Sequence, residues 1–218
     1  VAAPFGLVLG GGLEVAMQTA GVQTTGEVYM GLVEAGMGLL PAGGGCKEML
    51  RRTLGHIPKG VNYDPNPFVQ SVFMNIGLAK VSTSSEEALE MGYLRPSDRV
   101  SMDADRLLAD AKTLAIGLSK GYQAPRKTTF KLPGASGRSP IELRLYELNQ
   151  GGFATDHDVR VGQQIAHVLT GGDIPSNTVV TEQHILDLER EGFLSLLGEQ
   201  ATLARIQHFL TTGKVLRN

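Results

Sequence analysis

Several features are scarce in this chain of 218 residues, and each scarcity excludes a class of protein. A single cysteine excludes an internal disulfide framework and fits a reducing compartment, so we expect a cytoplasmic location. Acidic and basic residues nearly balance at a formal net charge of −2, which gives no electrostatic reason to expect nucleic acid or an anionic membrane as a partner. No apolar run reaches the roughly 18 residues that a membrane-spanning helix needs. A hydrophobic content of 42% is enough for one domain with a proper core.

Glycine, in contrast, is plentiful, and the stretch from Gly10 to Gly45 organises the chain. It begins Gly-Gly-Gly-Leu-Glu-Val-Ala-Met and ends Tyr-Met-Gly-Leu-Val-Glu-Ala-Gly-Met-Gly-Leu-Leu-Pro-Ala-Gly-Gly-Gly. The first three glycines separate an apolar run, 1–9, from a helix-like run, 13–20. Because glycine has no Cβ, a ligand can approach the main chain there, and a helix that starts at such a turn directs free N–H groups at it. The turn therefore suits an anion, or an oxygen that becomes negative during a reaction.

The residues around this turn argue against a bound phosphate. A dinucleotide fingerprint would need glycine or alanine where Val15 stands, and a Walker loop would need a lysine, whereas the first lysine of the chain is Lys47. Glu14 lies within the first helical turn, where its carboxylate would repel a phosphate. Backbone donors beside a carboxylate make more sense if the donors hold a developing oxyanion and the carboxylate moves a proton.

A second carboxylate, Glu34, follows an apolar, strand-like run at 28–33. Between Glu14 and Glu34 lie a predicted helix and a predicted returning strand, so the two side chains could meet over one site. Each also has a purely structural alternative: Glu14 as an ordinary acidic residue of a first helical turn, and Glu34 as a solvated loop residue.

The ordered glycines and both glutamates resemble the crotonase superfamily, and within it the enoyl-CoA hydratases. The resemblance implies an α/β fold with a crotonase-type core, a ββα spiral. It implies that the Gly11 N–H binds the thioester oxygen of an acyl-CoA, with Gly10 and Gly12 in the substrate-binding turn. It also implies that Glu14 and Glu34 flank the double bond, activating water and exchanging a proton with the α-carbon, without saying which is acid and which is base.

The C-terminal runs 186–199 and 205–218 look like the end of one branch of this superfamily. In that branch an NAD-dependent 3-hydroxyacyl-CoA dehydrogenase comes first and the crotonase module ends a multifunctional β-oxidation protein. The resemblance implies no cofactor for hydration, NAD for the dehydrogenase domain alone, and as partners that upstream domain, a trimeric homo-oligomer and a thiolase. It also implies that Phe209 and Lys214 touch the CoA of their own or a neighbouring subunit; the alternatives are a core phenylalanine and a surface charge.

The resemblance also predicts that the chain is N-terminally incomplete. In this family the first oxyanion donor and much of the CoA-binding surface lie upstream, whereas this chain starts at Val1 on what looks like the strand before the glycine turn. We therefore expect residues 1–119 to form the second half of a crotonase core and 141–218 a helical C-terminal extension. Residues 120–140 carry five basic and no acidic side chains and are expected to be a solvated connector, the alternative being a contact for CoA phosphates or a neighbouring domain.

Elsewhere, helical spacing and capping signals predict ordinary packed helices and two loops. Helices are expected at 47–54, 68–79, 84–92, 103–119, within 141–170 with a break at Gly151 and Gly152, at 182–197 and at 199–210, with loops at 55–67 and 171–181. Thr-Asp-His-Asp at 155–158 superficially suggests a metal site, but no second histidine follows at helical ligand spacing. We therefore expect no metal, and a structural histidine at a polar helix start.

Two other functions stay open from the sequence alone. Isomerisation of the double bond can use the same oxyanion donors with one glutamate, although the presence of both Glu14 and Glu34 favours hydration. A non-catalytic acyl-CoA-binding or assembly module would bind the thioester without turnover.

Overall fold

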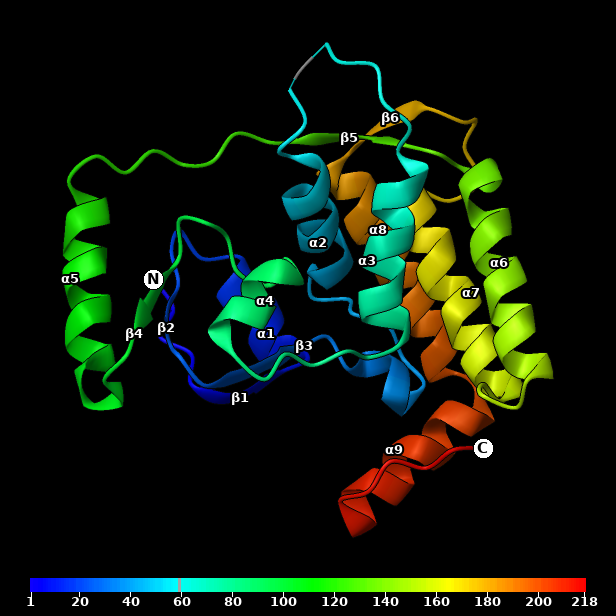
Figure 1. Ribbon diagram of the computed structural model, residues 1–218. Coiled ribbons are helices and arrows are strands. Elements are labelled where there is room, and N and C mark those ends of the chain that lie inside the picture. The colour runs from blue at the N-terminus through cyan, green and yellow to red at the C-terminus, as the bar shows by residue number, and fades with distance from the viewer. Residues whose placement is uncertain (59) are drawn as a thin grey trace.

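The computed structural model describes residues 1–58 and 60–218 and shows a mixed α/β chain in which helices predominate (Figure 1). The strands are β1 (Gly6–Leu9), β2 (Gln23–Thr25), β3 (Val28–Gly31), β4 (Arg99–Ser101), β5 (Thr129–Leu132) and β6 (Thr178–Thr181). The helices are α1 (Gly11–Met17), α2 (Gly45–Leu54), α3 (Asn66–Gly77), α4 (Ser85–Glu90), α5 (Leu107–Ser119), α6 (Ala135–Gln150), α7 (Asp156–Thr170), α8 (Glu182–Leu197) and α9 (Gln200–Thr212), with 3-10 turns η1 (Glu34–Met37) and η2 (Ala104–Arg106).

The pairing of β1 with β3 positions the candidate site. The two strands are parallel, with Gly6 opposite Val28 and Leu9 opposite Gly31. Parallel neighbours need a crossover connection, which α1 and β2 provide here. Because both strands run the same way, the glycine turn after β1 and Glu34 after β3 emerge at the same edge. The predicted helix and returning strand between the two glutamates are thus confirmed.

A layer of helices packs beside the strands that carry the glycine turn and Glu34. Figure 1 shows α2, α3, α6, α7 and α8 gathered on one side of the strands, with β5 and β6 paired antiparallel above them and α9 extending away from the gathered helices. The shared core is built from fully buried aliphatic side chains. Its members include Leu32, Leu40, Met49, Leu50, Ile76, Ile165, Val168 and Leu169. Each such side chain contributes about 1.5–3 kcal/mol relative to an exposed one, and burial of Ile185 and Leu196 in the same core fixes α8 beside the site.

Most predicted helices are confirmed, and some local signals are confirmed in detail. Ser84 caps α4, because its side chain accepts the N–H of Glu87. The predicted helix at 182–197 coincides with α8, and the break at Gly151 and Gly152 separates α6 from α7.

Residues 120–140 are not a connector throughout. Residues 129–132 form β5, in which Phe130 and Leu132 are buried, and α6 already begins at Ala135. The predicted loop 171–181 likewise contains β6, the partner of β5. Each strand has four residues, too few to show a periodicity, and the pair joins segments far apart in the chain.

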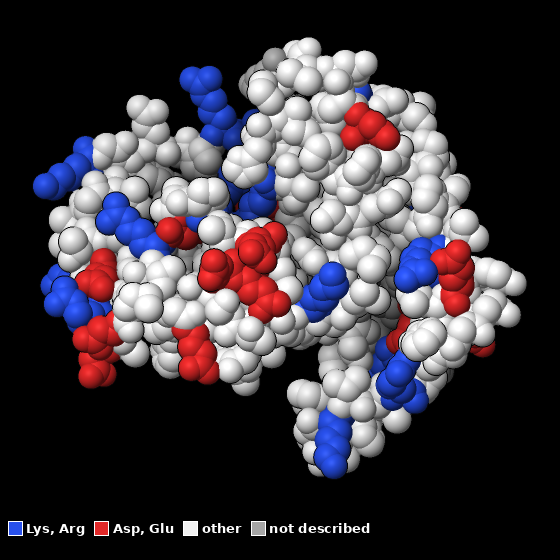
Figure 2. Space-filling model, in the orientation of Figure 1, with Lys and Arg blue, Asp and Glu red and all other residues white. Residues whose placement is uncertain are grey.

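The amphipathic stripe predicted for 103–119 is only partly buried. Leu107, Ala111 and Leu114 face the protein, whereas Leu108 is 74% exposed, because α5 packs at the margin of the molecule against β2 (Figure 1). Figure 2 shows acidic and basic side chains interspersed on the same face, with uncharged areas between them. In the described part of the chain no helix combines the length and apolar character needed to cross a membrane.

Candidate active site

The glycine turn leaves two backbone N–H groups free. Gly10 has φ 56° and ψ −131°, a combination that residues with a Cβ rarely adopt. Its N–H donates to the Gly31 carbonyl at 2.8 Å, which ties the turn to the end of β3. The N–H groups of Gly11 and Gly12 meet no acceptor among the described residues, as expected for the first residues of a helix. Both glycines are exposed, so these donors are available to a ligand oxygen.

The carboxylate of Glu14 is held by the loop before α2. The side chain is buried, and its Oε1 accepts the N–H groups of Gly43 and Gly45, each at 2.8 Å. Burial raises the pKa of Glu14 above its ordinary value, and the two N–H donors oppose that shift by favouring the charged form. No described donor reaches Oε2, so one oxygen is anchored and the other is available.

Glu34 lies opposite Glu14, at the start of η1. Burial, with a smaller contribution from the Glu14 carboxylate, raises the pKa of Glu34 to about 7. Its Oε2 is buried and has no hydrogen-bond partner in the described structure, which penalises the charged form. Near neutral pH this carboxyl group is therefore divided between its protonated and ionised forms.

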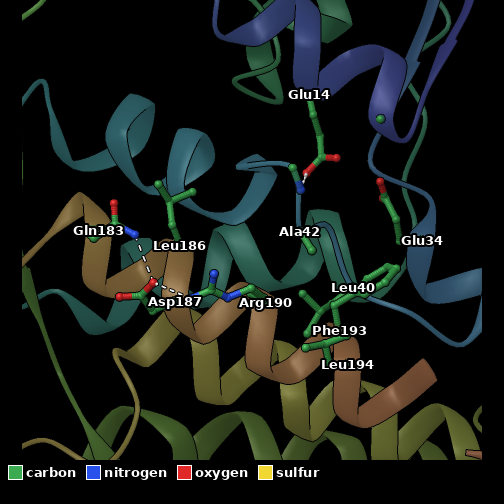
Figure 3. Close-up of a pocket in the computed structure, with 12 residues that line it drawn as sticks. Glu14, Glu34, Leu40, Ala42, Gln183, Leu186, Asp187, Arg190, Phe193 and Leu194 are labelled. Carbon is green, nitrogen blue, oxygen red and sulfur yellow. Dashed lines mark hydrogen bonds and ion pairs between the residues drawn. The ribbon is translucent and has the colours of Figure 1, made fainter. Parts of the chain in front are cut away.

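Glu14 and Glu34 enter one cavity of about 580 Å³ from different elements. Figure 3 shows their carboxyl groups directed toward one another, with α8 forming the opposite wall. Near the carboxyl groups the cavity is lined by apolar side chains, and farther out it is lined by a small cluster of polar side chains. The apolar lining residues are Leu40, Ala42, Leu186, Phe193 and Leu194. The polar cluster consists of Gln183, Asp187 and Arg190. Asp187 accepts hydrogen bonds from Gln183 at 3.0 Å and from Arg190 at 3.2 Å.

The sequence-predicted residues are only partly gathered here. Gly11, Glu14 and Glu34 line the cavity, and Gly10 lies against Glu34. Gly12 is in the same turn. The residues at 209 and 214 do not line this cavity within one chain: the phenylalanine is 41% exposed on α9 and the lysine follows that helix.

Sequence reasoning missed the wall that α8 contributes. The six lining residues of α8 recur at three- and four-residue spacing, which marks one helical face. The face mixes apolar, acidic and basic side chains, and such a mixture does not distinguish a cavity wall from a partly exposed helix surface. Only the packing of α8 against α2 and α7 places it at the site.

The turn that carries Glu34 is supported from the C-terminal helix. Thr202 on α9 donates to the Gly38 carbonyl at 2.8 Å, and Arg205 donates to the Ala35 carbonyl at 3.5 Å. Arg205 is 1% exposed and pairs with Asp158 at 2.8 Å. The helices α7 and α9 thus fix η1, and with it the position of Glu34.

The segment 155–158 forms a helix start, as predicted. Thr155 and Asp158 make a reciprocal capping box at the beginning of α7. His157 is buried, and its Nε2 lies 2.9 Å from the Thr202 hydroxyl. Among the residues that the structure describes, no group of three or more His, Cys, Asp or Glu is placed to hold a metal ion.

The chain is similar in sequence to parts of larger proteins, although no protein-family model matches it. It is 43% identical over its whole length to a Bacillus subtilis (strain 168) protein named "Probable 3-hydroxyacyl-CoA dehydrogenase", of which it spans 27%. Over 61% of its length it is 31% identical to the "Peroxisomal fatty acid beta-oxidation multifunctional protein" of Oryza sativa subsp. japonica, of which it spans 19%.

Solved structures show the fold. A carnitinyl-CoA hydratase from Mycobacterium avium matches with a TM-score of 0.53 at 17% identity, over 96% of this chain and 59% of that one. An enoyl-CoA hydratase from Mycobacterium avium subsp. paratuberculosis K-10 matches with a TM-score of 0.53 at 15% identity, over 98% of this chain and 62% of that one. The chain therefore has the crotonase fold of the enoyl-CoA hydratases, and spans about three-fifths of the length of these structures.

Proposed function

We propose that this chain carries the acid–base half of an enoyl-CoA hydratase site, which adds water reversibly to the double bond of 2-enoyl-CoA thioesters in β-oxidation. One observation carries the proposal: Glu14 and Glu34 face each other over one cavity beside the free N–H of Gly11. The names of the structural neighbours and of the larger relatives support the same chemistry.

The environments of the two carboxyl groups suggest their roles. Glu14 is anchored by two N–H donors that favour its charged form, so it acts as the base that takes a proton from water. Glu34, with a pKa of about 7 and an unpartnered oxygen, acts as the acid that gives a proton to the α-carbon. An O–H bond of water, the O–H bond of Glu34 and the C=C π bond break, while a C–O bond forms at the β-carbon, a C–H bond forms at the α-carbon and an O–H bond forms on Glu14. The reverse reaction exchanges the two roles.

The glycine turn would stabilise the charge that develops between these steps. As water adds to the β-carbon, negative charge accumulates on the thioester oxygen. The Gly11 N–H, with Gly10 shaping the turn and Gly12 beside it, is placed to bind that oxygen, and removal of such a donor typically costs about 10²–10³-fold in rate. A second donor would come from a segment outside these 218 residues, since the chain covers 62% or less of the solved structures named above.

The remaining cavity would bind the acyl group against Leu186 and Phe193 of α8. Contact of Phe209 and Lys214 with CoA fits a neighbouring copy in a trimer better than the same chain, because neither lines the cavity. In this proposal residues 1–119 form the second half of the crotonase core, and the helical extension begins with α6 at Ala135 rather than at 141, with β5 between the two.

The larger relatives suggest the setting. The chain would work in a protein that also carries 3-hydroxyacyl-CoA dehydrogenase activity, with NAD serving that activity and no cofactor needed for hydration. A thiolase would act on the dehydrogenase product, and the single cysteine fits the cytoplasm as location.

Hydration of crotonyl-CoA, followed as loss of the enoyl absorbance, tests the proposal. We would compare this chain with a version extended upstream by the rest of a crotonase domain. Turnover by either supports hydration, and turnover by the longer version alone assigns the missing donor to the added segment. Migration of the double bond without addition of water would indicate an isomerase. Binding of CoA esters without turnover by either version would indicate a binding module.

A further inference from the structure

Glu189 is a buried carboxylate that the proposed mechanism does not use. It lies on α8 with 0% exposure, and it does not line the cavity. Its Oε2 accepts the N–H of Gly44 at 3.0 Å and its Oε1 the N–H of Lys47 at 2.7 Å. The ammonium group of Lys47 pairs with Glu48 at 2.6 Å instead, so among the described residues Glu189 is held by backbone donors. Burial of a carboxyl group without a cation partner is costly, whether the group stays ionised or is held protonated, and this cost calls for an explanation.

The side chains of Glu14 and Glu189 accept hydrogen bonds from different N–H groups of the same short segment, 43–47. Gly43 and Gly45 donate to Glu14, whereas Gly44 and Lys47 donate to Glu189. Gly44 has φ 99°, in the left-handed region that favours glycine, and this turn of the backbone directs successive N–H groups to opposite sides. The segment 43–47 is thus held between a carboxylate from α1 and a carboxylate from α8.

Helix capping alone does not require this arrangement. One local side chain, such as Ser or Asp at the first position, normally satisfies the free N–H groups of a helix start. Here Gly44 has no side chain, and one acceptor comes from 145 residues away in the sequence. That distant acceptor lies on α8, the same helix whose Leu186 and Phe193 line the cavity.

We propose that Glu189 is a positioning residue for Glu14. By holding the N–H groups of Gly44 and Lys47, it sets the segment so that the N–H groups of Gly43 and Gly45 grip Glu14 Oε1 and leave Oε2 directed at Glu34 (Figure 3). The wall of the cavity and the orientation of the base then depend on one helix. The catalytic consequence rests on the proposed hydratase function, whereas the mechanical link does not.

The pKa of Glu189 is consistent with this proximity. Burial raises it to about 8, and the Glu14 carboxylate contributes to the increase, while the N–H groups of Lys47 and Gly44 oppose it. The two carboxylates therefore interact across the shared segment.

A double-mutant cycle on crotonyl-CoA hydration tests the catalytic part, in whichever form of the protein is active. Glu189→Gln should lower kcat on the order of 10- to 100-fold with KM little changed, since small misplacement of a catalytic group costs that much. In a Glu14→Gln background the same substitution should add almost nothing. Glu191→Gln, an exposed position on the same helix, is the matched control. Equal losses in both backgrounds, or no loss in either, would overturn the proposal.

Amide hydrogen exchange tests the mechanical link without any activity. If Glu189 clamps the segment, Glu189→Gln should lower the protection of Gly43 and Gly45, whose own acceptor Glu14 is intact. If Glu189 is only a local cap, Gly44 and Lys47 alone should change, and the proposal fails. Should Glu189→Gln not fold, Glu189→Asp, which keeps the carboxyl group but is shorter by one methylene, takes its place in both experiments. If the unsubstituted protein does not hydrate crotonyl-CoA but Glu189→Gln still lowers the protection of Gly43 and Gly45, the hydratase function is refuted and the positioning of the segment by Glu189 is retained.

Discussion

Replacing Glu34 by glutamine should make the protein more stable above neutral pH while it abolishes most of its turnover. The side chain keeps its shape, but the amide stays neutral at every pH. In the folded wild type the pKa of this carboxyl group is about 7, against an ordinary 4.5. Between these two values the unfolded chain has lost the proton and the folded chain retains it. The free energy of unfolding of the wild type therefore falls as the pH rises through this window, relative to the variant.

The size of the effect follows from the pKa difference. A raised pKa of this extent corresponds to about 3 kcal/mol, and partial solvent screening reduces the expected gain to on the order of 2 kcal/mol. The gain should be near zero at about pH 4.5, grow up to about pH 7 and stay constant above it. Turnover of crotonyl-CoA should fall by about 10²–10⁴-fold, because the acid is lost.

Urea unfolding at several pH values, followed by far-ultraviolet circular dichroism, measures the difference in free energy of unfolding between variant and wild type. Circular dichroism is used because the chain has no tryptophan to report by fluorescence. Glu90→Gln serves as the control because Glu90 is an exposed glutamate on α4, and its stability difference should not grow with pH. A pH-independent difference for Glu34→Gln, or a loss of stability at about pH 8, would refute a buried carboxyl group with a raised pKa.

Three further substitutions test the site and its support. Glu14→Gln should lower kcat/KM for crotonyl-CoA by about 10²–10⁴-fold, and full activity would remove Glu14 from the mechanism. Gly10→Ala should destabilise the protein by about 1–3 kcal/mol in urea unfolding, because of its positive φ and the contact of a new Cβ with Glu34, 3.3 Å from Oε1. Gly12→Ala is its control, since a Cβ there meets nothing within 4 Å, and equal losses would contradict the strain. Arg205→Met should cost about 2–4 kcal/mol by removing the buried cation beside Asp158, which keeps only the longer contact of 3.7 Å with Arg217 as an ion pair, whereas the exposed pair Arg160–Glu199 should contribute about 1 kcal/mol or less. A similar cost for Arg160→Met would show that burial of Arg205 is not the reason.

Local signals made much of the framework predictable. The glycine triplet predicted a turn before a helix because the free backbone donors and the missing Cβ are properties of a few consecutive residues. The helix starts at α4 and α8 were predictable for the same reason, because capping and helix-forming interactions lie within one or two turns of chain. The crotonase resemblance rested on the order of such local features, and the fold that it implied is confirmed.

Long-range pairing was not predictable in the same way. The strands β5 and β6 pair residues about fifty positions apart, inside segments that the sequence predicted to be a connector and a loop. Phe130 is buried because β6 and the helices pack around it, and Leu108 stays exposed because α5 lies at the margin of the molecule. Neither the burial of Phe130 nor the exposure of Leu108 can be predicted from the residues next to it in the sequence.

The chemistry of the site likewise depends partly on local sequence and partly on tertiary packing. The sequence by itself determined that two carboxylates and a set of free N–H groups occur in an order suited to acid–base work on a developing oxyanion. Only the tertiary structure decided that Glu14 and Glu34 share a cavity, that α8 forms its wall, and that Glu189 holds the loop behind Glu14. Burial raises the pKa of a carboxyl group and makes an unpartnered oxygen costly, and burial depends on what packs around a residue rather than on its neighbours in the chain.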